Sequence, residues 1–155
     1  MNKTENQEEI YEKRLEQRNI KPTALRVLIL KELLHEKDMA VSMSELENAL
    51  VTVDKSTIFR TITLFLAHHL IHCVDDGTGA LKYAVCDLDC NCDVDDLHSH
   101  FYCEGCHMTF CLKHTHVPIV KLPDGFEIHT VNYVLKGLCP SCAERQRKKE
   151  AQNII

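Results

Sequence analysis

The stretch DKSTIFRTITLFLAHHLIHCVDDGTGALKYAVC (54–86) decides the fold of this chain. Its first half places apolar residues at the i, i+4, i+7, i+8 spacing of a helix with one packed face. These residues are Ile58, Ile62, Phe65 and Leu66. Residues 70–74 and 81–86 have the composition of two strands, and the turn-rich segment 75–79 joins them. The stretch therefore predicts a helix that leads directly into a β-hairpin.

Further helices are expected before this stretch. Residues 7–18 show a mostly polar helical pattern, and a stronger apolar pattern begins near Pro22. Ser42 and Glu45 form the Ser-x-x-Glu pattern of a capping box, which predicts the start of another helix. Helices followed by a two-stranded wing predict a winged helix-turn-helix, in which the helix capped by Asp54 is the recognition helix.

The outward face of that helix is the predicted DNA-contact surface. Two basic residues at the start of the helix expected near Pro22 are added to it. The predicted contacts are Lys21, Arg26, Lys55, Ser56, Thr57, Phe59 and Arg60. The alternative is an ordinary solvated helix face, but the position between helices and a hairpin favours DNA. The net charge is −5, so DNA binding must depend on a local basic surface rather than on bulk charge.

Composition indicates a reduced environment. The N-terminus lacks the pattern of a signal peptide, and no apolar run approaches the roughly 20 residues of a membrane span. Nine cysteines without a secretory signal predict free thiols that bind metal rather than form disulfides. We therefore expect a cytoplasmic protein whose partners include neither a membrane nor a small organic substrate.

Two Cys-x-x-Cys pairs predict a structural zinc site. They are Cys103 with Cys106 and Cys139 with Cys142. Four thiolates satisfy tetrahedral Zn²⁺, and each short turn lets two sulfurs converge on one ion. One pair alone would fit a redox dithiol equally well, whereas two pairs with matched spacing favour zinc, with one ion per subunit.

Three histidines and a further thiol are candidate ligands of a second metal site. A hairpin turn centred on residues 77–79 makes His72 and Cys86 diagonal neighbours on one face of paired strands. His98 and His100 alternate onto one face of the next expected strand. Imidazole and thiolate ligands favour Zn²⁺ over harder ions. Taken singly, His72 fits a half-buried strand histidine and Cys86 a small core residue.

The chain is expected to be α+β with two small domains. Residues 1–86 form the winged-helix domain, residues 87–97 an acidic linker, and residues 98–155 a second α/β domain. Strands are expected at 98–103, 108–112 and 126–135. The linker thiols Cys90 and Cys92 fit a further metal, a redox-sensitive flap or a merely polar loop. The basic tail after the second knuckle is helical or frayed and is assigned no role.

Four segments together resemble the ferric uptake regulator family of bacterial metal-dependent repressors. They are NIKPTALRVLIL (19–30), DKSTIFRTITLFLAHHLI (54–71), HSHFYCEGC (98–106) and KGLCPSC (136–142). The resemblance covers roughly residues 10–142, with Phe59 where tyrosine is common. It implies a homodimeric repressor with an N-terminal winged helix, a C-terminal dimerisation domain, a structural zinc and a sensory metal site at the hinge.

The sensory site indicates the branch of the family. Two ligand positions of the iron- and peroxide-sensing members correspond to Ala40 and Ala84, which cannot coordinate a metal. His72 and Cys86 stand where the resemblance places ligands of the zinc uptake regulators, and Cys111 stands at the later acidic ligand position. The predicted regulatory ligands are therefore His72, Cys86, His98, His100 and Cys111. Zn²⁺ is the expected ion, with Fe²⁺ as the alternative.

Two departures from the family pattern concern the C-terminal domain. The family's dimer-domain helix is expected to be shortened, because Pro118 and Pro123 stand where it should run. A second regulatory site lacks ligands, since Leu97 and Ser99 replace a histidine and an aspartate. Three remaining histidines are weak candidates as ligands, namely His114, His116 and His129.

The predicted function is a zinc-responsive transcriptional repressor that binds a duplex operator and controls metal-uptake genes. The rival in the same class is an iron- or peroxide-responsive regulator. A zinc-ribbon interaction module would explain the four cysteines but not the winged-helix pattern. A zinc hydrolase or deaminase is disfavoured, because the deaminase signature needs His-x-Glu and Pro-Cys-x-x-Cys. This chain has His98-Ser99-His100, and Leu138 precedes Cys139.

Overall fold

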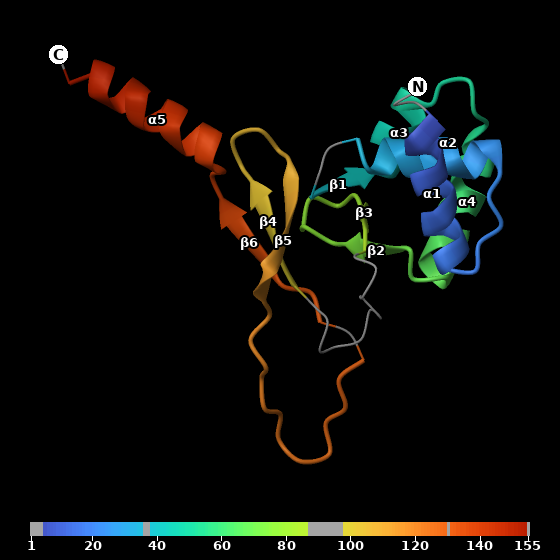
Figure 1. Ribbon diagram of the computed structural model, residues 1–155. Helices are drawn as coiled ribbons and strands as arrows, with labels where there is room; N and C mark the ends of the chain where they lie inside the picture. Colours follow the sequence, from blue (N-terminus) through green and yellow to red (C-terminus); the bar gives the residue numbers. More distant parts are fainter. Residues whose placement is uncertain (1–4, 36–37, 87–97, 130, 155) are drawn as a thin grey trace.

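The computed structural model describes residues 5–35, 38–86, 98–129 and 131–154. An N-terminal helical unit leads through a wing into a C-terminal group of strands and a last helix (Figure 1). The helices are α1 (Glu5–Gln17), α2 (Ala24–Leu33), α3 (Met43–Ala49), α4 (Lys55–Ala67) and α5 (Pro140–Gln152). The strands are β1 (Met39–Ser42), β2 (Ile71–Val74), β3 (Lys82–Val85), β4 (His98–Cys103), β5 (Thr109–His116) and β6 (Val134–Gly137).

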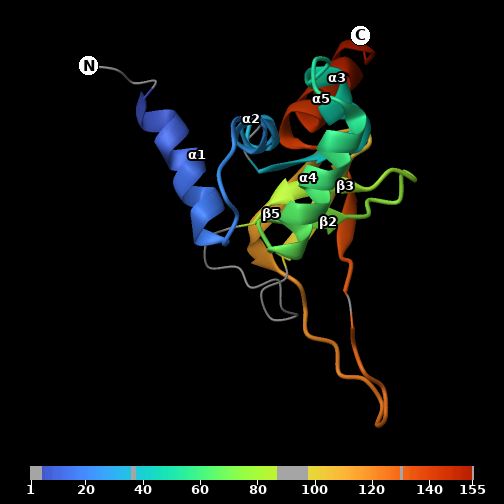
Figure 2. The ribbon, with the colours of Figure 1, turned by 90° about the vertical axis from the view of Figure 1, so that its right-hand side faces the viewer.

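Helices α1 to α4 enclose the main hydrophobic core. Its fully buried members come from each helix, and they include Leu15, Ile29, Leu30, Leu46, Ile58, Ile62 and Phe65. Leu70, Ile71 and Val85 of the hairpin close the same core. Figure 2 shows α4 lying across the wing strands, so burial of its apolar face fixes which face of α4 points outward. The helices and the hairpin predicted from the sequence are confirmed.

Local capping begins the inner helices where the sequence indicates. The Ser42 hydroxyl accepts from the Glu45 amide at 3.2 Å, and the Ser42 amide donates to the Glu45 carboxylate at 2.7 Å, which completes the capping box. Thr23 caps α2 by accepting from the amide of Arg26 at 3.3 Å. Asp54 occupies the N-cap position of α4, but its carboxylate accepts from the Ser56 hydroxyl and makes no side-chain cap bond.

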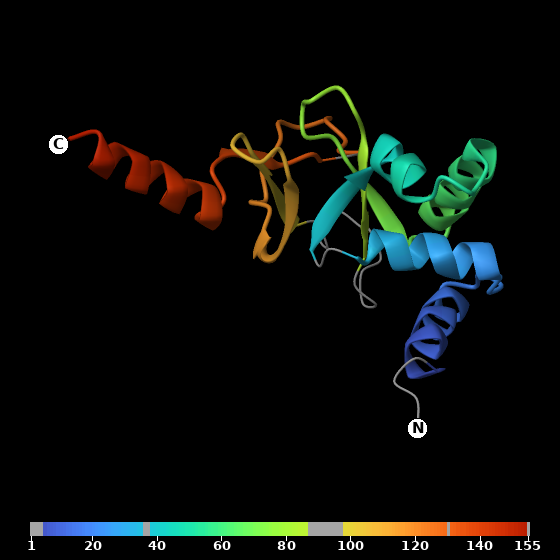
Figure 3. The ribbon, with the colours of Figure 1, turned by 90° about the horizontal axis from the view of Figure 1, so that it is seen from above.

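The strands form one six-stranded sheet in the order β2-β3-β1-β5-β4-β6. Strand β1, which the sequence analysis did not predict, pairs with β3 through Val41 and Tyr83 and with β5 through Ala40 and Thr109. It therefore joins the wing hairpin to the C-terminal strands. Figure 3 shows the helical unit at one end of this sheet and α5 projecting from the other.

The prediction of a strand at residues 126–135 is wrong for most of its length. Regular pairing begins only at Val134, where β6 runs parallel to β4. β-branched and aromatic residues favour a strand only where they pack on a neighbour, and Phe126 is 68% exposed. Residues 117–129 and 131–133 form the long extended loop of Figure 1, and no helix is found in them, as Pro118 and Pro123 indicate.

Two further expectations concern the ends of the C-terminal part. The basic tail is a regular helix, α5, which begins directly at the second knuckle. The acidic linker 87–97, with Cys90 and Cys92, lies outside the described residues. Within the described part of the chain, none of the helices combines the length and apolarity needed to cross a bilayer.

Candidate metal centres and nucleic-acid interface

The four knuckle cysteines converge at the junction of β4, β6 and α5. Their sulfur atoms all lie within 4.8 Å of one another, and Cys106 Sγ is 4.0 Å from Cys139 Sγ. Zn–S bonds of about 2.3 Å hold sulfurs about 3.8 Å apart in a tetrahedron. The group therefore fits a tetrahedral zinc ion with a closed ligand set, as predicted from Cys103, Cys106, Cys139 and Cys142.

Backbone amides favour the thiolate form of Cys103. The amide of Cys139 donates to Cys103 Sγ at 3.3 Å, and the amide of Cys106 donates to it at 3.5 Å. Burial by itself raises the pKa of Cys103, but these amide hydrogen bonds outweigh burial and lower the pKa to about 6. Cys103 is thus readily deprotonated at neutral pH, which is the form that binds metal.

Close packing in the knuckle explains one glycine. A side chain at Gly105 would bring its Cβ to 3.0 Å from both Cβ and Sγ of Cys142. Contacts that short require a shift of the neighbouring cysteine. Gly105 is therefore needed for the two Cys-x-x-Cys turns to close on one another.

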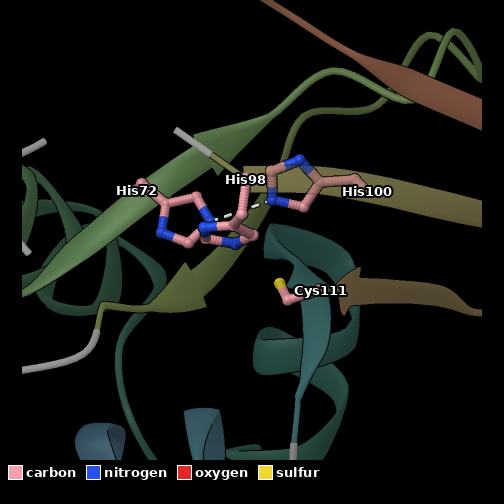
Figure 4. A group of neighbouring side chains, drawn as sticks. All are labelled: His72, His98, His100 and Cys111. Carbon is pink, nitrogen blue, oxygen red and sulfur yellow. Dashed lines mark hydrogen bonds between the residues drawn. The ribbon is translucent and has the colours of Figure 1, made fainter. Parts of the chain in front are cut away.

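A second group combines three histidines with a cysteine. One ligand atom from each of His72, His98, His100 and Cys111 lies within 4.8 Å of the others. Figure 4 shows the three rings facing one another with the sulfur turned toward them. His72 Nε2 and His100 Nε2 are 3.1 Å apart, close to the roughly 3.3 Å that two imidazole nitrogens have on a tetrahedral zinc with 2.0–2.1 Å bonds.

The sheet brings these four residues together from separate parts of the chain. His72 lies on β2 of the wing, whereas His100 and Cys111 are direct partners across β4 and β5. His98 and His100 have ring centroids 4.8 Å apart, so the expected placement on one side of the strand holds. Burial, with a smaller contribution from His98, lowers the pKa of His100 to about 4. His100 is therefore neutral near pH 7, with a lone pair available for a metal.

Cys86 lies beside this group rather than among its four convergent atoms. The hairpin register pairs His72 with Ala84, which makes Cys86 the diagonal neighbour, as the sequence predicts. Its sulfur is 3.3 Å from Nδ1 of His72, while Nε2 of the same ring faces His100. Cys86 is therefore placed to orient the imidazole ring of His72. That Cys86 also binds the metal stays a prediction.

The other candidate ligands fall outside both groups. His114 and His129 are exposed, and neither belongs to a group of convergent ligand atoms among the described residues. Ser99 is buried. Leu97 and the side chain of His116 lie outside the described part of the structure.

The predicted DNA-contact residues of α4 form one outward face. Lys55, Ser56, Phe59 and Arg60 are exposed, and Thr57 is half-buried. Arg60 is held along the helix by bonds from Nε to the Ser56 carbonyl at 3.3 Å and from Nη2 to its hydroxyl at 3.1 Å. Lys55 pairs with Glu47 at 3.5 Å. Such exposed pairs are weak and can be exchanged for contacts with phosphates.

The two basic residues of α2 occupy a different place. Lys21 precedes the helix and is exposed, and Arg26 lies in its first turn. Arg26 Nη1 donates to the Lys21 carbonyl at 2.7 Å. The bond stiffens the entry into α2 and uses only part of the donor capacity of the guanidinium. Contact with DNA at both positions stays a prediction.

The comparisons agree on the fold. No family model and no curated protein matches the sequence. A zinc uptake regulator solved with zinc and DNA superposes with a TM-score of 0.66, covering 95% of this chain and 99% of its own, at 20% identity. The ferric uptake regulator of Vibrio cholerae gives 0.55, covering 83% and 98%, at 16% identity. A zinc-bound manganese uptake regulator gives 0.56, covering 83% and 98%, at 17% identity.

The chain has the fold of the ferric uptake regulators. Two polar features of this fold were not predicted from the sequence. Asp76, Lys82 and Thr109 form a buried network between the wing and β5. A signal for Lys82 was present, because it shares the inward face of its strand with Ala84 and Cys86.

The second missed feature is Arg145 on α5. Its Nη2 donates to Cys142 Sγ at 2.9 Å, so the tail that was assigned no role contributes a cation beside the four thiolates. Cys139 occupies the N-cap position of α5 and Cys142 lies in the first turn, where the helix dipole also favours negative sulfur. No spacing rule in the sequence would have indicated this contact.

Proposed function

We propose that this chain is a member of the ferric uptake regulator family that acts as a zinc-responsive, DNA-binding transcriptional repressor of metal-uptake genes. The observation that carries the proposal is the histidine–cysteine group (His72, His98, His100 and Cys111), which takes one ligand from the wing and three from the C-terminal strands. An ion held there would tie α4 and its wing to the rest of the molecule.

The chemistry of the donors supports zinc as the sensed metal. Three imidazoles and a thiolate suit Zn²⁺ better than harder ions, which prefer oxygen ligands, and a thiolate beside redox-active iron is liable to oxidation. Ala40 and Ala84, which stand at ligand positions of the iron-sensing members, are buried with Val74 in a small apolar cluster. Fe²⁺ remains the alternative ion for the same residues.

The four-cysteine site supports a structural role for the other ion. Its ligand set is closed, whereas a catalytic zinc keeps an open position for water or substrate. The surrounding cluster adds only partly buried apolar side chains such as Phe101, Phe110 and Leu138. The metal would therefore take the place of a larger hydrophobic core, and we expect no enzymatic activity.

Control of DNA binding would follow from the position of the wing. Metal binding would hold the wing, through His72, against β4 and β5, and would so fix the orientation of α4 relative to the C-terminal strands. In a dimer, that orientation determines whether two recognition helices match successive major grooves about 34–36 Å apart. Metal that binds the closed arrangement more tightly shifts the population toward it.

The proposal is tested with duplexes selected from a random-sequence pool by the zinc-loaded protein. Binding of the selected duplex should saturate with Zn²⁺, fall on chelation of the weaker site, and recover on adding zinc back. An Fe²⁺ midpoint below the Zn²⁺ midpoint, each set against its cellular availability, would return the chain to the iron-sensing alternative. Failure to select any duplex would leave the zinc-ribbon interaction module as the better interpretation.

The DNA-contact face of α4 is tested by replacing Arg60 with alanine. We expect weaker binding of the selected duplex and a salt dependence that is flatter by about 0.9 in log–log slope, the value for one lost phosphate contact. The matched control is Arg147→Ala, an exposed arginine on α5 at the other end of the molecule. Unchanged affinity and slope in Arg60→Ala would show that α4 is not the helix that contacts DNA.

Homodimerisation is supported by the apolar loop between β5 and β6. Ile119 is 89% exposed and Phe126 68% exposed, and Val120, Leu122 and Ile128 are exposed beside them. Such a set on one extended segment is typical of an interface whose partner is absent. A second copy of the chain is the partner that the family resemblance implies.

Replacing Phe126 with glutamate should therefore shift the protein toward monomer. Loss of an aromatic anchor costs about 2 kcal/mol or more, so the dimer dissociation constant should rise at least roughly 30-fold. Sedimentation over a dilution series measures it. Val51→Glu, at an exposed apolar position of the helical unit, is the control and should leave the mass unchanged. A Phe126→Glu protein as dimeric as wild type would exclude this loop from the interface.

A further inference from the structure

Three buried polar side chains form a closed triangle where the wing turn meets β5. Asp76 is 1% exposed, Thr109 1% and Lys82 8%. Lys82 Nζ lies 2.6 Å from Asp76 Oδ2 and donates to Thr109 Oγ1 at 2.8 Å. The Thr109 hydroxyl in turn donates to Asp76 Oδ2 at 2.7 Å. Two corners of the triangle belong to the wing, and only Thr109 belongs to the C-terminal strands.

The triangle is fully bonded, which is the condition for a buried ion pair to hold. The second oxygen of Asp76 accepts from the Thr78 amide at 3.0 Å and from the Thr78 hydroxyl at 2.5 Å. Burial by itself raises the pKa of Asp76, but the bonds from Lys82, Thr78 and Thr109 outweigh it and hold the pKa well below its usual range. Asp76 is therefore an anion at neutral pH.

One more hydrogen bond holds the same turn against the C-terminal part, and a lysine side chain lies close to it. Asn132 Nδ2 donates to the Asp75 carbonyl at 2.7 Å. The Lys136 ammonium lies so close to Gly77 that a Cβ there would come within 2.9 Å of it, and Gly77 has a φ of +79°. The exposed wing turn is thus hydrogen-bonded to the C-terminal part through Asn132, just before β6.

The triangle and the histidine–cysteine group are two ends of one interface. On β2 and its extension, His72, Val74 and Asp76 alternate onto the same side, and on β5 Thr109 and Cys111 do so. An apolar cluster that contains Val74 and reaches Cys111 joins the two polar ends. Because closely packed groups move together, loosening one end lowers the population in which the other end is assembled.

We propose that Asp76, Lys82 and Thr109 form a polar latch that holds the wing against β5 and so sets the zinc concentration at which the histidine–cysteine group fills. This inference rests on the proposed function. The apparent dissociation constant equals the intrinsic one divided by the fraction of closed chains. A latch that raises this fraction without metal makes the sensor more sensitive, and these three are positioning residues that touch no metal.

The test replaces Thr109 with valine, which removes the hydroxyl that joins β5 to Asp76 and Lys82 and keeps the shape and the β-branched side chain. The matched control is Thr78→Val, which removes a hydroxyl bond to the same carboxylate but lies wholly within the wing. Thr109→Ser restores the hydroxyl. All proteins are prepared with the four-cysteine site loaded and the second group empty.

Two measurements are made on these proteins. Hydrogen exchange at residues 109–112 reports on the β1–β5 junction, where the Cys111 amide donates to the Asp38 carbonyl at 2.6 Å. Zinc titration against a competing chelator gives the midpoint of the histidine–cysteine group. In Thr109→Val we expect faster hydrogen exchange. The zinc concentration at the midpoint should rise roughly tenfold, which corresponds to the free energy of one hydrogen bond to a charged group. Thr78→Val should change neither, and Thr109→Ser should restore both.

The outcomes separate the latch from the function on which it rests. Unchanged exchange and midpoint in Thr109→Val, or equal changes in Thr78→Val, would overturn the latch while zinc binding itself stands. A wild-type chain that takes up no zinc at the histidine–cysteine group would overturn the proposed function and the regulatory role of the latch. Hydrogen exchange would still show, in that case, whether the triangle holds the wing.

Discussion

Replacing Cys106 with serine should release the structural zinc and unfold the C-terminal part of the chain. A hydroxyl is a poor ligand for Zn²⁺, and the four sulfurs stand in the middle of a cluster that has few apolar neighbours. Apparent binding energies of structural zinc reach about 10–16 kcal/mol in small zinc modules, as large as the whole stability of a typical domain. Loss of one ligand should therefore remove most of the folding energy of this region.

The measurements are zinc content per chain, circular dichroism and mass in solution. Cys106→Ser should lose close to one zinc per chain together with the dimer, while the helical unit around α4 keeps its signal because its core is separate. Cys73→Ser is the control, since Cys73 is exposed and belongs to neither group of convergent ligands. A Cys106→Ser protein that stays dimeric with unchanged zinc would refute the structural assignment.

Replacing Cys111 with serine should have the largest effect on metal sensing without unfolding the chain. The two side chains have nearly the same shape, and Cys111 pairs with His100 in the middle of the sheet. Loss of a residue that only hydrogen-bonds to a metal ligand typically weakens metal binding roughly 10–100-fold. Loss of the Cys111 thiolate should raise the zinc midpoint of operator binding by more than this. Operator binding should then demand more zinc rather than disappear, because metal biases an existing equilibrium.

Cys86→Ser is the matched comparison at the same group. If Cys86 orients His72 through Nδ1, serine can still bond the ring, and the midpoint should rise within or below that 10–100-fold range. Both variants should keep the dimer and the structural zinc. Equal and large shifts would place Cys86 among the ligands, and an unchanged midpoint in Cys111→Ser would remove Cys111 from the site.

Most of the helical unit and the four-cysteine group could be predicted from local spacing, whereas the full set of regulatory ligands came from the family resemblance. Apolar residues at helical spacing predicted α4, and the Ser42–Glu45 pattern predicted the start of α3. The turn at 75–79 set a register that correctly made His72 and Cys86 diagonal neighbours. These features depend on residues close in sequence, where the periods of helix and strand are visible directly.

The sequence by itself determined the winged-helix pattern, the two matched Cys-x-x-Cys pairs and the placement of His98 and His100 on one face of a strand. Only the tertiary structure decided that β1 joins the wing to β5 and that the last strand begins as late as Val134. It also decided that Nδ1 of His72 faces Cys86. It alone placed Lys82 and Asp76 against Thr109. The physical reason is that strand pairing and buried ion pairs depend on neighbours distant along the chain, and local periodicity carries no record of those neighbours.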